Sequence, residues 1–483
     1  MPKVIQTPLS SFPYQNVDSS MLDILGDVLY DGYIDVLPDG DLISIKRPGL
    51  SEFISTLNTV GKVDSLYWWD AKSVGISVSM GNVSKLTTSS GVFSSITGDK
   101  LAEGKRATFA QNGSYLVIAN EGKMVYTDGT ANTAYITDAD APQDVTHVAF
   151  LDDYVIAFQK GTSKVSFADF TTTPTNWSAT DFFTAESSPD GLLALHVHRD
   201  SRTVILFGSD STEFWVNDGN TPFSRIQSAP IGKGLMAAHC VVEVDGNFYF
   251  FDNNRRLNIL SGTLSQELPS SFDRVIQSFS TVSDCIGDYI HIMGKKWLLF
   301  QFPTENRSFI YDIENNYWAE WTYWFVPESR RDMFIGRCYA YMRGWNYHLF
   351  GSKSTDTLYR MDESFYKDHN VEIMHTKRTG HLDHDAPFNT NRCYGLNMRL
   401  KTGIGLNSDP SVSPKMLIRY RDNGSTQWSN SLEVNLRSQG NQYFPVELYN
   451  LGSYKTRQWE INMSDDAPFQ LGKTFEKVDV NVY

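Results

Sequence analysis

The sequence predicts an all-β protein: a β-propeller, with seven blades favoured and six possible, and a C-terminal antiparallel β-sandwich-like domain. Aromatic residues make up 13% of the 483 residues, and flat or branched side chains pack well on pleated strands. Short apolar runs recur at roughly 40–50-residue spacing, each followed by a polar turn and a second run. A long amphipathic pattern of helical period is missing from the sequence. Repeats of this length, with about four strands each, are typical of propeller blades.

The repeated element is a hairpin. The seven hairpin patterns begin at Val74, Tyr115, Tyr154, Thr203, Phe248, Trp297 and Tyr347. Tight hairpin turns need residues that accept a positive φ, and Asp-Gly and Asn-Gly pairs supply them. Such pairs occur at Asn112-Gly113, Asp128-Gly129, Asp190-Gly191, Asp218-Gly219 and Asp245-Gly246.

Four segments follow from these patterns. Residues 1–60 are punctuated by Pro and Gly and predict an extended arm or a ring-closing segment. Residues 61–364 carry the hairpins and predict the propeller body. The hairpin pattern stops at residues 365–390, which predicts a linker. Short alternating runs return at residues 391–483 and predict a β domain that packs on the ring or completes it.

Charge and cysteine usage narrow the functional class. The formal net charge is −14 and no basic cluster is present, which argues against a protein that grips DNA through its phosphates. The four cysteines form no Cys-x-x-Cys pair, so neither a zinc ribbon nor a redox pair is expected, and assembly in a reducing compartment is indicated. The sequence shows neither a signal-peptide pattern nor a run of about 18 apolar residues, so we expect no membrane-spanning segment.

Two clusters contain residue types that bind metals. His196 and His198 share one strand face with Asp200, but no further ligand is identifiable, and a structural role is favoured. The run from His381 to Asp385 is the densest such cluster, and a solvated loop is favoured for it. The sequence contains no G-x-S-x-G, P-loop or H-E-x-x-H motif. We therefore expect no metal, no cofactor and no catalytic residues.

The most aromatic stretch runs from Tyr317 to Phe325 and includes Trp318, Trp321 and Trp324. Alternation puts aromatic rings on both faces of a strand, which predicts a strand covered on two sides by neighbouring blades or by a partner. A platform for sugar rings is the alternative, because aromatic planes stack on pyranose rings. A second motif, from Asp422 to Trp428, resembles the Asp-box hairpin of sialidase propellers. Its Trp lies one position late and only one copy is present, so it gives weak support for a sialidase.

One motif is more specific than these patterns. An Ala-Glu-Ser-x-Pro-Asp-Gly turn precedes an apolar strand, an Arg-Asp pair, a second strand that ends in Phe-Gly-Ser, and an aromatic strand, and a Lys-Gly step follows. These positions are Ala185, Glu186, Ser187, Pro189, Asp190, Gly191, Arg199, Asp200, Phe207, Gly208, Ser209, Phe214, Lys233 and Gly234. The arrangement resembles packaged-DNA stabilisation proteins, the tail hub or nozzle components of short-tailed bacteriophages. The resemblance covers most of the chain and is strongest at residues 183–240.

The resemblance implies a structural virion protein and no enzyme. It implies a ring of subunits, six copies by resemblance, that lies below the portal and its adaptor in the virion tail and is assembled in the host bacterial cytoplasm. Such rings extend the DNA channel, help to retain packaged DNA and anchor tail fibres, spikes or a needle, and double-stranded DNA passes through them without sequence-specific binding. An acidic lumen suits this passage because it repels phosphates. The alternatives are a phage-tail propeller glycosidase, which needs carboxylates and arginines at a propeller mouth, or a glycan- or receptor-binding module.

Overall fold

The protein is built almost entirely of strands. The computed structural model describes residues 3–9, 13, 27–55, 61–130, 132–185, 190–219, 223–227, 230–269, 272–384, 389–442 and 446–482. The helical elements among these residues are short: α2 (Asp273–Gln277), η2 (Asp70–Lys72) and η3 (Val326–Glu328). No helix in the described part of the chain is long and apolar enough to cross a membrane. The predicted all-β class is confirmed.

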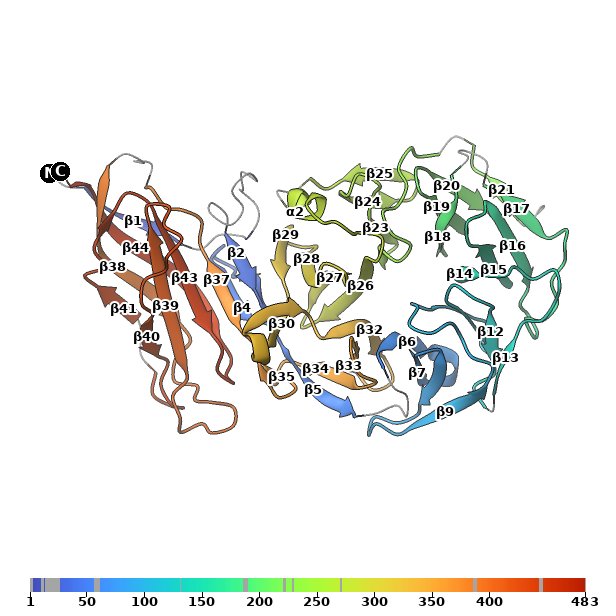
Figure 1. The fold of residues 1–483 in the computed structure, drawn as a ribbon, viewed down its shortest axis with the longest axis horizontal. Coiled ribbons are helices and arrows are strands. Elements are labelled where there is room, and N and C mark those ends of the chain that lie inside the picture. Colours follow the sequence, from blue (N-terminus) through green and yellow to red (C-terminus); the bar gives the residue numbers. More distant parts are fainter. Residues whose placement is uncertain are drawn as a thin grey trace.

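Most of the strands form a ring of antiparallel sheets (Figure 1). Within the described residues, these strands group into seven four-stranded units. Consecutive strands pair inside each unit, except that the fourth strand of unit 7 comes from the N-terminal segment. Unit 1 contains β6 (Val63–Trp69), β7 (Val74–Ser79), β8 (Asn82–Leu86) and β9 (Phe93–Gly98), and unit 2 contains β10 (Thr108–Gln111), β11 (Leu116–Ala119), β12 (Val125–Thr127) and β13 (Asn132–Tyr135). Unit 3 contains β14 (Val145–Leu151), β15 (Tyr154–Gln159), β16 (Lys164–Asp169) and β17 (Phe182–Thr184). Unit 4 contains β18 (Leu192–His198), β19 (Thr203–Gly208), β20 (Thr212–Val216) and β21 (Ser224–Arg225).

Units 5 to 7 continue the ring in chain order. Unit 5 contains β22 (Val241–Val244), β23 (Asn247–Phe251), β24 (Leu257–Ser261) and β25 (Leu264–Glu267). Unit 6 contains β26 (Ile286–Ile292), β27 (Lys295–Phe302), β28 (Arg307–Asp312) and β29 (Tyr317–Glu320). Unit 7 contains β32 (Gly336–Met342), β33 (Tyr347–Ser352) and β34 (Leu358–Asp362), together with β5 (Gly49–Ile54). The hairpins predicted from the sequence are the second and third strands of these units. We propose that the seven units are the blades of the propeller.

The ring closes through the N-terminal segment. Strand β5 pairs antiparallel with β34, so residues from the start of the chain supply the outer strand of unit 7. This pairing fixes the first and last parts of the ring to each other. It also covers an edge of β34 that would otherwise expose unpaired backbone groups. We propose residues 61–364, completed by β5, as the propeller body.

The turns follow the predicted chemistry with one exception. Gly113, Gly129, Gly219 and Gly246 have φ values of 94°, 78°, 84° and 76°. The prediction is wrong at Gly191, whose φ lies outside the positive region. The neighbouring Asp190 explains the difference, because its carboxylate holds a separate turn in place and the Asp190-Gly191 pair is not a two-residue hairpin loop.

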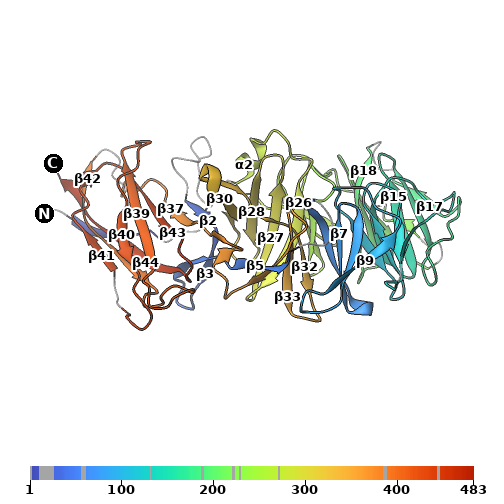
Figure 2. The ribbon, with the colours of Figure 1, turned by 60° about the horizontal axis from the view of Figure 1, so that its bottom comes forward.

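A second body, which we call the C-terminal sandwich, lies beside the ring (Figures 1 and 2). One sheet has the order β3-β4-β44-β38-β41 with β1 and β42 attached, and the other extends unit 6 in the order β29-β2-β37-β43-β39-β40. The strands are β1 (Lys3–Pro8), β2 (Val28–Tyr30), β3 (Gly32–Val36), β4 (Leu42–Lys46), β37 (His375–Arg378), β38 (Thr390–Leu400), β39 (Lys415–Asp422), β40 (Leu432–Asn435), β41 (Val446–Tyr449), β42 (Ser453–Tyr454), β43 (Arg457–Met463) and β44 (Gln470–Val482). Both sheets contribute to one apolar core that includes Met398, Ile418 and Trp459. We propose residues 391–483 as the main part of this domain.

Residues 365–390, where the sequence predicts a linker, contain β35 (Lys367–Asp368), β36 (Val371–Glu372) and β37. Strand β37 pairs with β2 and β43, and β35 pairs with β5. The segment therefore runs inside the sheets that join the two bodies, because its backbone groups pair with strands on both sides. The remaining strands, β30 (Thr322–Phe325) and β31 (Arg330–Met333), form a two-stranded sheet at this junction.

A buried ion network ties the junction together. Arg47 is fully buried, and its Nε donates to Asp31 Oδ1 at 2.9 Å. Its Nη1 and Nη2 donate to the two oxygens of Asp368 at 2.9 and 2.5 Å. Arg331 donates from Nη1 to the second oxygen of Asp31 at 2.8 Å. Since these residues come from the N-terminal segment, β31 and β35, the network fixes parts of the chain that lie far apart in sequence.

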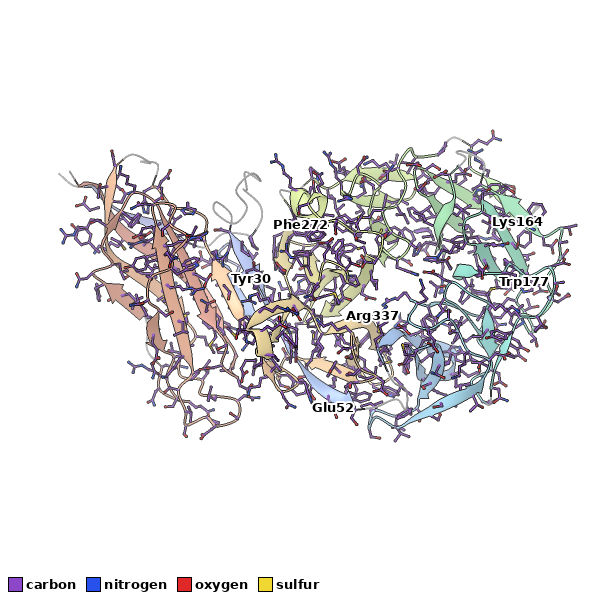
Figure 3. The ribbon with its side chains drawn as sticks, viewed as in Figure 1. Tyr30, Glu52, Lys164, Trp177, Phe272 and Arg337 are labelled. Atoms are coloured by element: carbon purple, nitrogen blue, oxygen red, sulfur yellow. The ribbon has the colours of Figure 1, made fainter. Side chains whose placement is uncertain are left out.

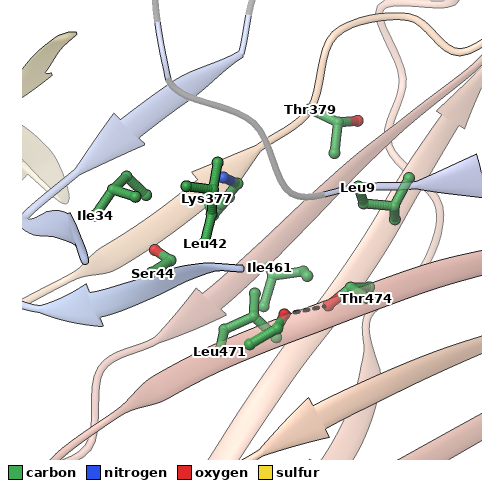
Figure 4. Close-up of a pocket in the computed structure, with 10 residues that line it drawn as sticks. Leu9, Ile34, Leu42, Ser44, Lys377, Thr379, Ile461, Leu471 and Thr474 are labelled. Carbon is green, nitrogen blue, oxygen red and sulfur yellow. Dashed lines mark hydrogen bonds between the residues drawn. The ribbon is translucent and has the colours of Figure 1, made fainter. Parts of the chain in front are cut away.

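Figure 4 shows the side chains that line a small cavity between the N-terminal strands and the sandwich. A cavity of about 10 Å³ lies between Leu9, Leu42, Lys377 and Leu471. Thr474 closes one side, and its hydroxyl donates to the Gly472 carbonyl at 3.1 Å. A space of this size holds about one water molecule, so it is not a ligand site.

His375 gives the junction a pH dependence. Its side chain is fully buried, its Nδ1 lies 3.2 Å from the Asp31 carbonyl oxygen, and burial lowers its pKa to about 3. An unfolded histidine has a pKa of about 6.5, so between these values the unfolded chain binds more protons than the folded one. Stability therefore falls as the pH drops below about 6.5, and we expect this residue to contribute a loss of about 2 kcal/mol between pH 7 and pH 5.

The measurement is the free energy of unfolding from urea denaturation at both pH values. His375→Gln should lose less stability than the wild-type protein over this interval. His369→Gln, at an exposed position beside Glu52, is the control and should follow the wild-type pH dependence. Equal pH dependence in all three proteins would contradict the assignment.

Candidate functional site: the central channel of the propeller

The first strand of each unit lines the centre of the ring (Figure 1). A cavity of about 980 Å³ opens where several of these strands end and turn outwards, and we call it the funnel. Its lining comes from β6, β26 and β32, from the turns that follow them, from His348 of β33, and from single residues of units 2, 4 and 5. The sequence prediction located the hairpins of the units but not this cavity.

Two ion pairs lie between units of the ring beside the funnel. Arg106 of unit 2 makes a hydrogen-bonded ion pair with Asp288 of unit 6, although the two residues are 182 positions apart in the sequence. Arg337 of unit 7 donates from Nη1 to Asp64 Oδ1 of unit 1 at 2.6 Å. Both carboxylates are buried. Figure 3 shows Arg337 on the inner side of the ring, whereas Glu52 and Lys164 lie at its outer rim. We call the two ion pairs, Arg106–Asp288 and Arg337–Asp64, the plug.

Three histidines make further contacts between units near the centre of the ring. The His147 ring of unit 3 stacks on His239, which precedes unit 5, with 4.9 Å between ring centroids, and His196 of unit 4 lies 5.9 Å from His147. Burial lowers the pKa of His196 to about 4 and that of His239 to about 3, and it holds the pKa of His147 well below its usual value. The three rings are therefore neutral at physiological pH. The Arg106–Asp288 pair therefore connects units that are not neighbours along the ring, and the stacked rings connect units 3, 4 and 5.

Burial also acts on the plug carboxyls. It raises the pKa of Asp288, and the Arg106 guanidinium opposes this rise. The second oxygen of Asp288 is buried and has no hydrogen-bond partner among the described atoms. Asp288 thus belongs both to the plug and to the lining of the funnel.

The family-like motif lies mainly at the contact between units 4 and 5. Asp190 accepts hydrogen bonds from the backbone N–H groups of Asp210 and Ser211 at 2.8 and 3.0 Å and from the Ser211 hydroxyl at 3.0 Å. Its carboxylate packs against Gly208, where a Cβ atom would collide with it. Phe207 is fully buried in the core shared by units 4 and 5. These residues fix the turn between β19 and β20.

The Lys-Gly step continues this contact. Lys233 Nζ donates to Asn258 Oδ1 at 2.6 Å and lies 3.6 Å from the buried Asp252 carboxylate. Gly234 packs so closely on the backbone of Ser209 that a Cβ atom would collide with it. The Lys-Gly step therefore connects unit 4 to unit 5 through the ion pairs of Lys233 with Asp252 and Glu267 and through one close backbone contact.

The other motif residues are placed differently. Ala185 is buried and donates its N–H to the Ser163 carbonyl. Arg199 lines the funnel, and Asp200 is exposed in the same β18–β19 turn. Gly191 begins the approach to β18. Glu186, Ser187 and Pro189 lie outside the described residues.

The aromatic stretch is not one strand. It divides at Trp321 into β29 and β30, and the prediction of a single alternating strand is wrong because the chain bends there to leave unit 6. Trp318 is 2% exposed and stacks on Phe272 at 4.2 Å, and Trp321 is fully buried. Both indoles lie in the core of this chain, so neither offers a surface to a partner or a sugar. Trp324 is half-buried.

The two clusters of metal-binding residue types do not converge on a common point. His196 faces His147, whereas His198 Nδ1 lies 2.6 Å from the Ser201 hydroxyl. The solvated-loop prediction for residues 381–385 is wrong at His384, whose side chain is buried and lies 2.7 Å from the Tyr454 hydroxyl. Asp385 is outside the described residues. Within the described part of the chain, no group of three or more His, Cys, Asp or Glu side chains is arranged to hold a metal ion.

The Asp-box-like motif lies between β39 and β40 in the C-terminal sandwich. Asp422 accepts two hydrogen bonds from Arg457, at 2.7 and 2.8 Å. Trp428 lies against Arg419 and Arg421, with 4.9 and 4.8 Å between each guanidinium carbon and the ring centroid. The motif therefore stabilises a loop of the sandwich and lies outside the ring.

Comparison with known proteins assigns the ring to a family. A family model described as "Bacteriophage P22 Gp10, beta-propeller" matches residues 45–366. The chain belongs to this family. It is therefore a bacteriophage structural protein of the virion tail, and the resemblance stated for residues 183–240 is confirmed. The match begins within β4, which agrees with the contribution of β5 to the ring.

Two further comparisons add less. No curated protein matches the chain. Among solved structures, the chain is similar to the extracellular domain of a one-component system from B. thetaiotaomicron, with 12% identity and a TM-score of 0.45. The similar region covers 91% of this chain and 62% of that protein, so the Gp10-family chain spans less than two thirds of its length.

Sequence reasoning missed the plug, although a signal was present. Asp64, Asp288 and Arg337 are single charged residues near the beginning of otherwise apolar or aromatic first strands. A charged residue in such a position is rarely buried unless it is paired. Its partner lies on another unit, so the sequence indicates that a pair exists but not where it forms.

Proposed function

We propose that this Gp10-family chain is the subunit of a ring, six copies by resemblance, that forms the tail hub or nozzle below the portal and its adaptor. The ring extends the DNA channel, helps to retain packaged DNA and anchors tail fibres, spikes or a needle. Subunits are assembled in the host cytoplasm. The membership in the family supports this role, and the four cysteines, all free and buried, suit assembly in a reducing compartment.

The closed plug is the observation that carries the proposal furthest. A duplex does not fit through a channel that the Arg106–Asp288 pair crosses, so DNA must pass outside the propeller of each subunit. A ring of several subunits provides such a path along its own symmetry axis. Head-to-tail contacts close into a ring when the rotation between neighbours permits it. The propellers then serve as rigid blocks in the wall of the channel.

The charge of the chain supports passage without adhesion. A net charge of −14 disfavours contact with phosphates, whereas clustered Lys and Arg would slow the DNA through salt-dependent binding. We propose Trp324, which is half-buried near the junction of the two bodies, as a contact to a neighbouring subunit or to a fibre, spike or needle protein.

Native mass spectrometry of the purified chain, alone and mixed with the portal–adaptor complex, tests this function. We expect a high-order ring on the adaptor, and electron microscopy of the same mixture should show a central lumen between the propellers. A chain that stays monomeric and does not bind the adaptor would refute the proposal.

A second candidate function has one supporting observation. The alternative of a saccharide-handling protein requires carboxylates and arginines at a propeller mouth, and Asp70, Glu243, Arg199 and Arg343 line the funnel. Hydrolysis of a glycosidic bond needs an acid and a base on either side of that bond, whereas stacking rings and charged hydrogen-bonding groups are sufficient for binding. We therefore develop this candidate as binding and not as hydrolysis.

A further inference from the structure

The funnel is a cavity that the tail-hub function does not use. Asp288 of the plug lies in its lining, and its rim is open on the face where β6, β26 and β32 end. The volume of about 980 Å³ lies at the upper end of the range for small-molecule sites.

Aromatic rings form one wall of the funnel. The His348 ring stacks on Tyr341 with 4.9 Å between centroids and on Tyr339 with 6.1 Å, so three rings from β32 and β33 lie nearly parallel. Tyr289 and His291 form a second parallel pair on β26, at 6.2 Å. Tyr341 and His291 are exposed. Flat rings at a cavity surface offer apolar faces together with polar edges.

Charged groups of both signs complete the lining. Asp70, Glu243 and Asp288 supply carboxylates, and Arg199 and Arg343 supply guanidinium groups. Arg343 Nη1 lies 3.4 Å from Asp70 Oδ2 across the rim. In the floor, Asp288 is 7% exposed and one of its oxygens has no hydrogen-bond partner among the described atoms.

The mixed charge limits what the funnel can bind. An anionic ligand would meet three carboxylates, and a cationic one would meet two guanidinium groups. An ionised carboxylate only accepts hydrogen bonds and a guanidinium only donates them, whereas a hydroxyl group does both. A ring that carries several hydroxyl groups and an apolar face therefore satisfies the carboxylates, the guanidinium groups and the aromatic wall together.

We propose that the funnel binds an uncharged saccharide. The sugar ring stacks on the Tyr341 side of the aromatic wall, and its hydroxyl groups donate to Glu243 and accept from Arg199. This site is separate from the aromatic stretch at Tyr317–Phe325, whose two buried indoles reach no cavity. Binding here goes beyond the ring-forming role and does not depend on it, because every lining residue belongs to one chain.

The test measures binding of maltose, lactose and N,N′-diacetylchitobiose to the full chain by saturation-transfer difference NMR and calorimetric titration. We expect at least one of these sugars to bind. Tyr341→Ala should weaken its affinity by about tenfold, because the stacking face is lost, and Glu243→Gln should weaken it by a similar factor, because a charge-assisted acceptor is lost. Tyr449→Ala, at a 63%-exposed tyrosine of β41 in the sandwich, should leave the affinity unchanged.

Each other outcome overturns the proposal. It fails if none of the three sugars binds at millimolar concentration, if the funnel variants bind as the wild type does, or if Tyr449→Ala weakens binding equally. A short arginine-rich peptide and a neutral tetrapeptide are titrated in parallel, and binding of a peptide that Tyr341→Ala abolishes would assign the funnel to a protein partner instead. Ring assembly on the adaptor is measured separately, so failure of this site is distinguishable from failure of the tail-hub role.

Discussion

Replacing Arg47 with methionine should lower the free energy of unfolding by about 3–5 kcal/mol. Arg47 is fully buried at the junction of the ring and the sandwich and pairs with Asp31 and Asp368, which are 1% and 2% exposed. Methionine fills a similar volume but leaves two buried carboxylates without their main counter-ion. Burial already raises the pKa of Asp368, and Arg47 opposes that rise, so we expect the Arg47→Met variant to protonate this group and to lose order at the junction.

Urea denaturation followed by tryptophan fluorescence measures this loss, since Trp321 lies next to the guanidinium. Lys415→Met is the matched control. Lys415 pairs with Glu433 on the surface of the sandwich, where both side chains are 53% exposed, and exposed pairs contribute about 0–1 kcal/mol. If the two variants lost the same amount of stability, the network would not hold the junction.

Replacing Arg106 with methionine should also destabilise the protein by about 3–5 kcal/mol, because Asp288 then remains as an uncompensated charge in the floor of the funnel. Arg106 has no second carboxylate partner among the described residues. The effect should appear as early unfolding of the ring, because the pair joins units 2 and 6 across the centre. Circular dichroism during thermal denaturation measures the loss of β-structure in the whole chain.

A double-mutant cycle separates the pair from its surroundings. In Arg106→Met/Asp288→Leu both charges are removed together, and replacing a buried ion pair with apolar residues is often neutral or stabilising. We therefore expect the double variant to recover most of the stability that Arg106→Met loses. Additive losses in the cycle would show that the two residues act independently and that the plug is not a coupled unit.

The plug and the funnel have different roles in the propeller: the plug gives rigidity, and the funnel is the proposed ligand site. The Arg106–Asp288 pair and the stacked His147 and His239 rings stiffen the propeller, because they connect units that are not neighbours along the ring. The open rim remains available to a ligand. A phage tail protein with this arrangement can contribute its outer surfaces to assembly and its funnel to recognition, without one task disturbing the other.

The sequence by itself determined the class of fold and the position of each hairpin. Hairpins such as β19–β20 and turns such as Asp245-Gly246 depend on alternation of apolar residues and on positive φ within a few residues. The same local pattern located the family motif around Asp190. The exception at Gly191 arose because the carboxylate of Asp190 bonds to a turn that lies about twenty residues further along the chain.

Only the tertiary structure decided which residues meet. Strand β5 joins unit 7, Arg337 meets Asp64 over 273 positions, and His384, which the sequence predicts in a solvated loop, is buried beside Tyr454. Trp318 and Trp321 became core residues for the same reason, since rings from other strands cover them. Alternation and turn chemistry act between neighbours in the chain, whereas closing the ring brings together side chains whose separation in sequence carries no information about their partners.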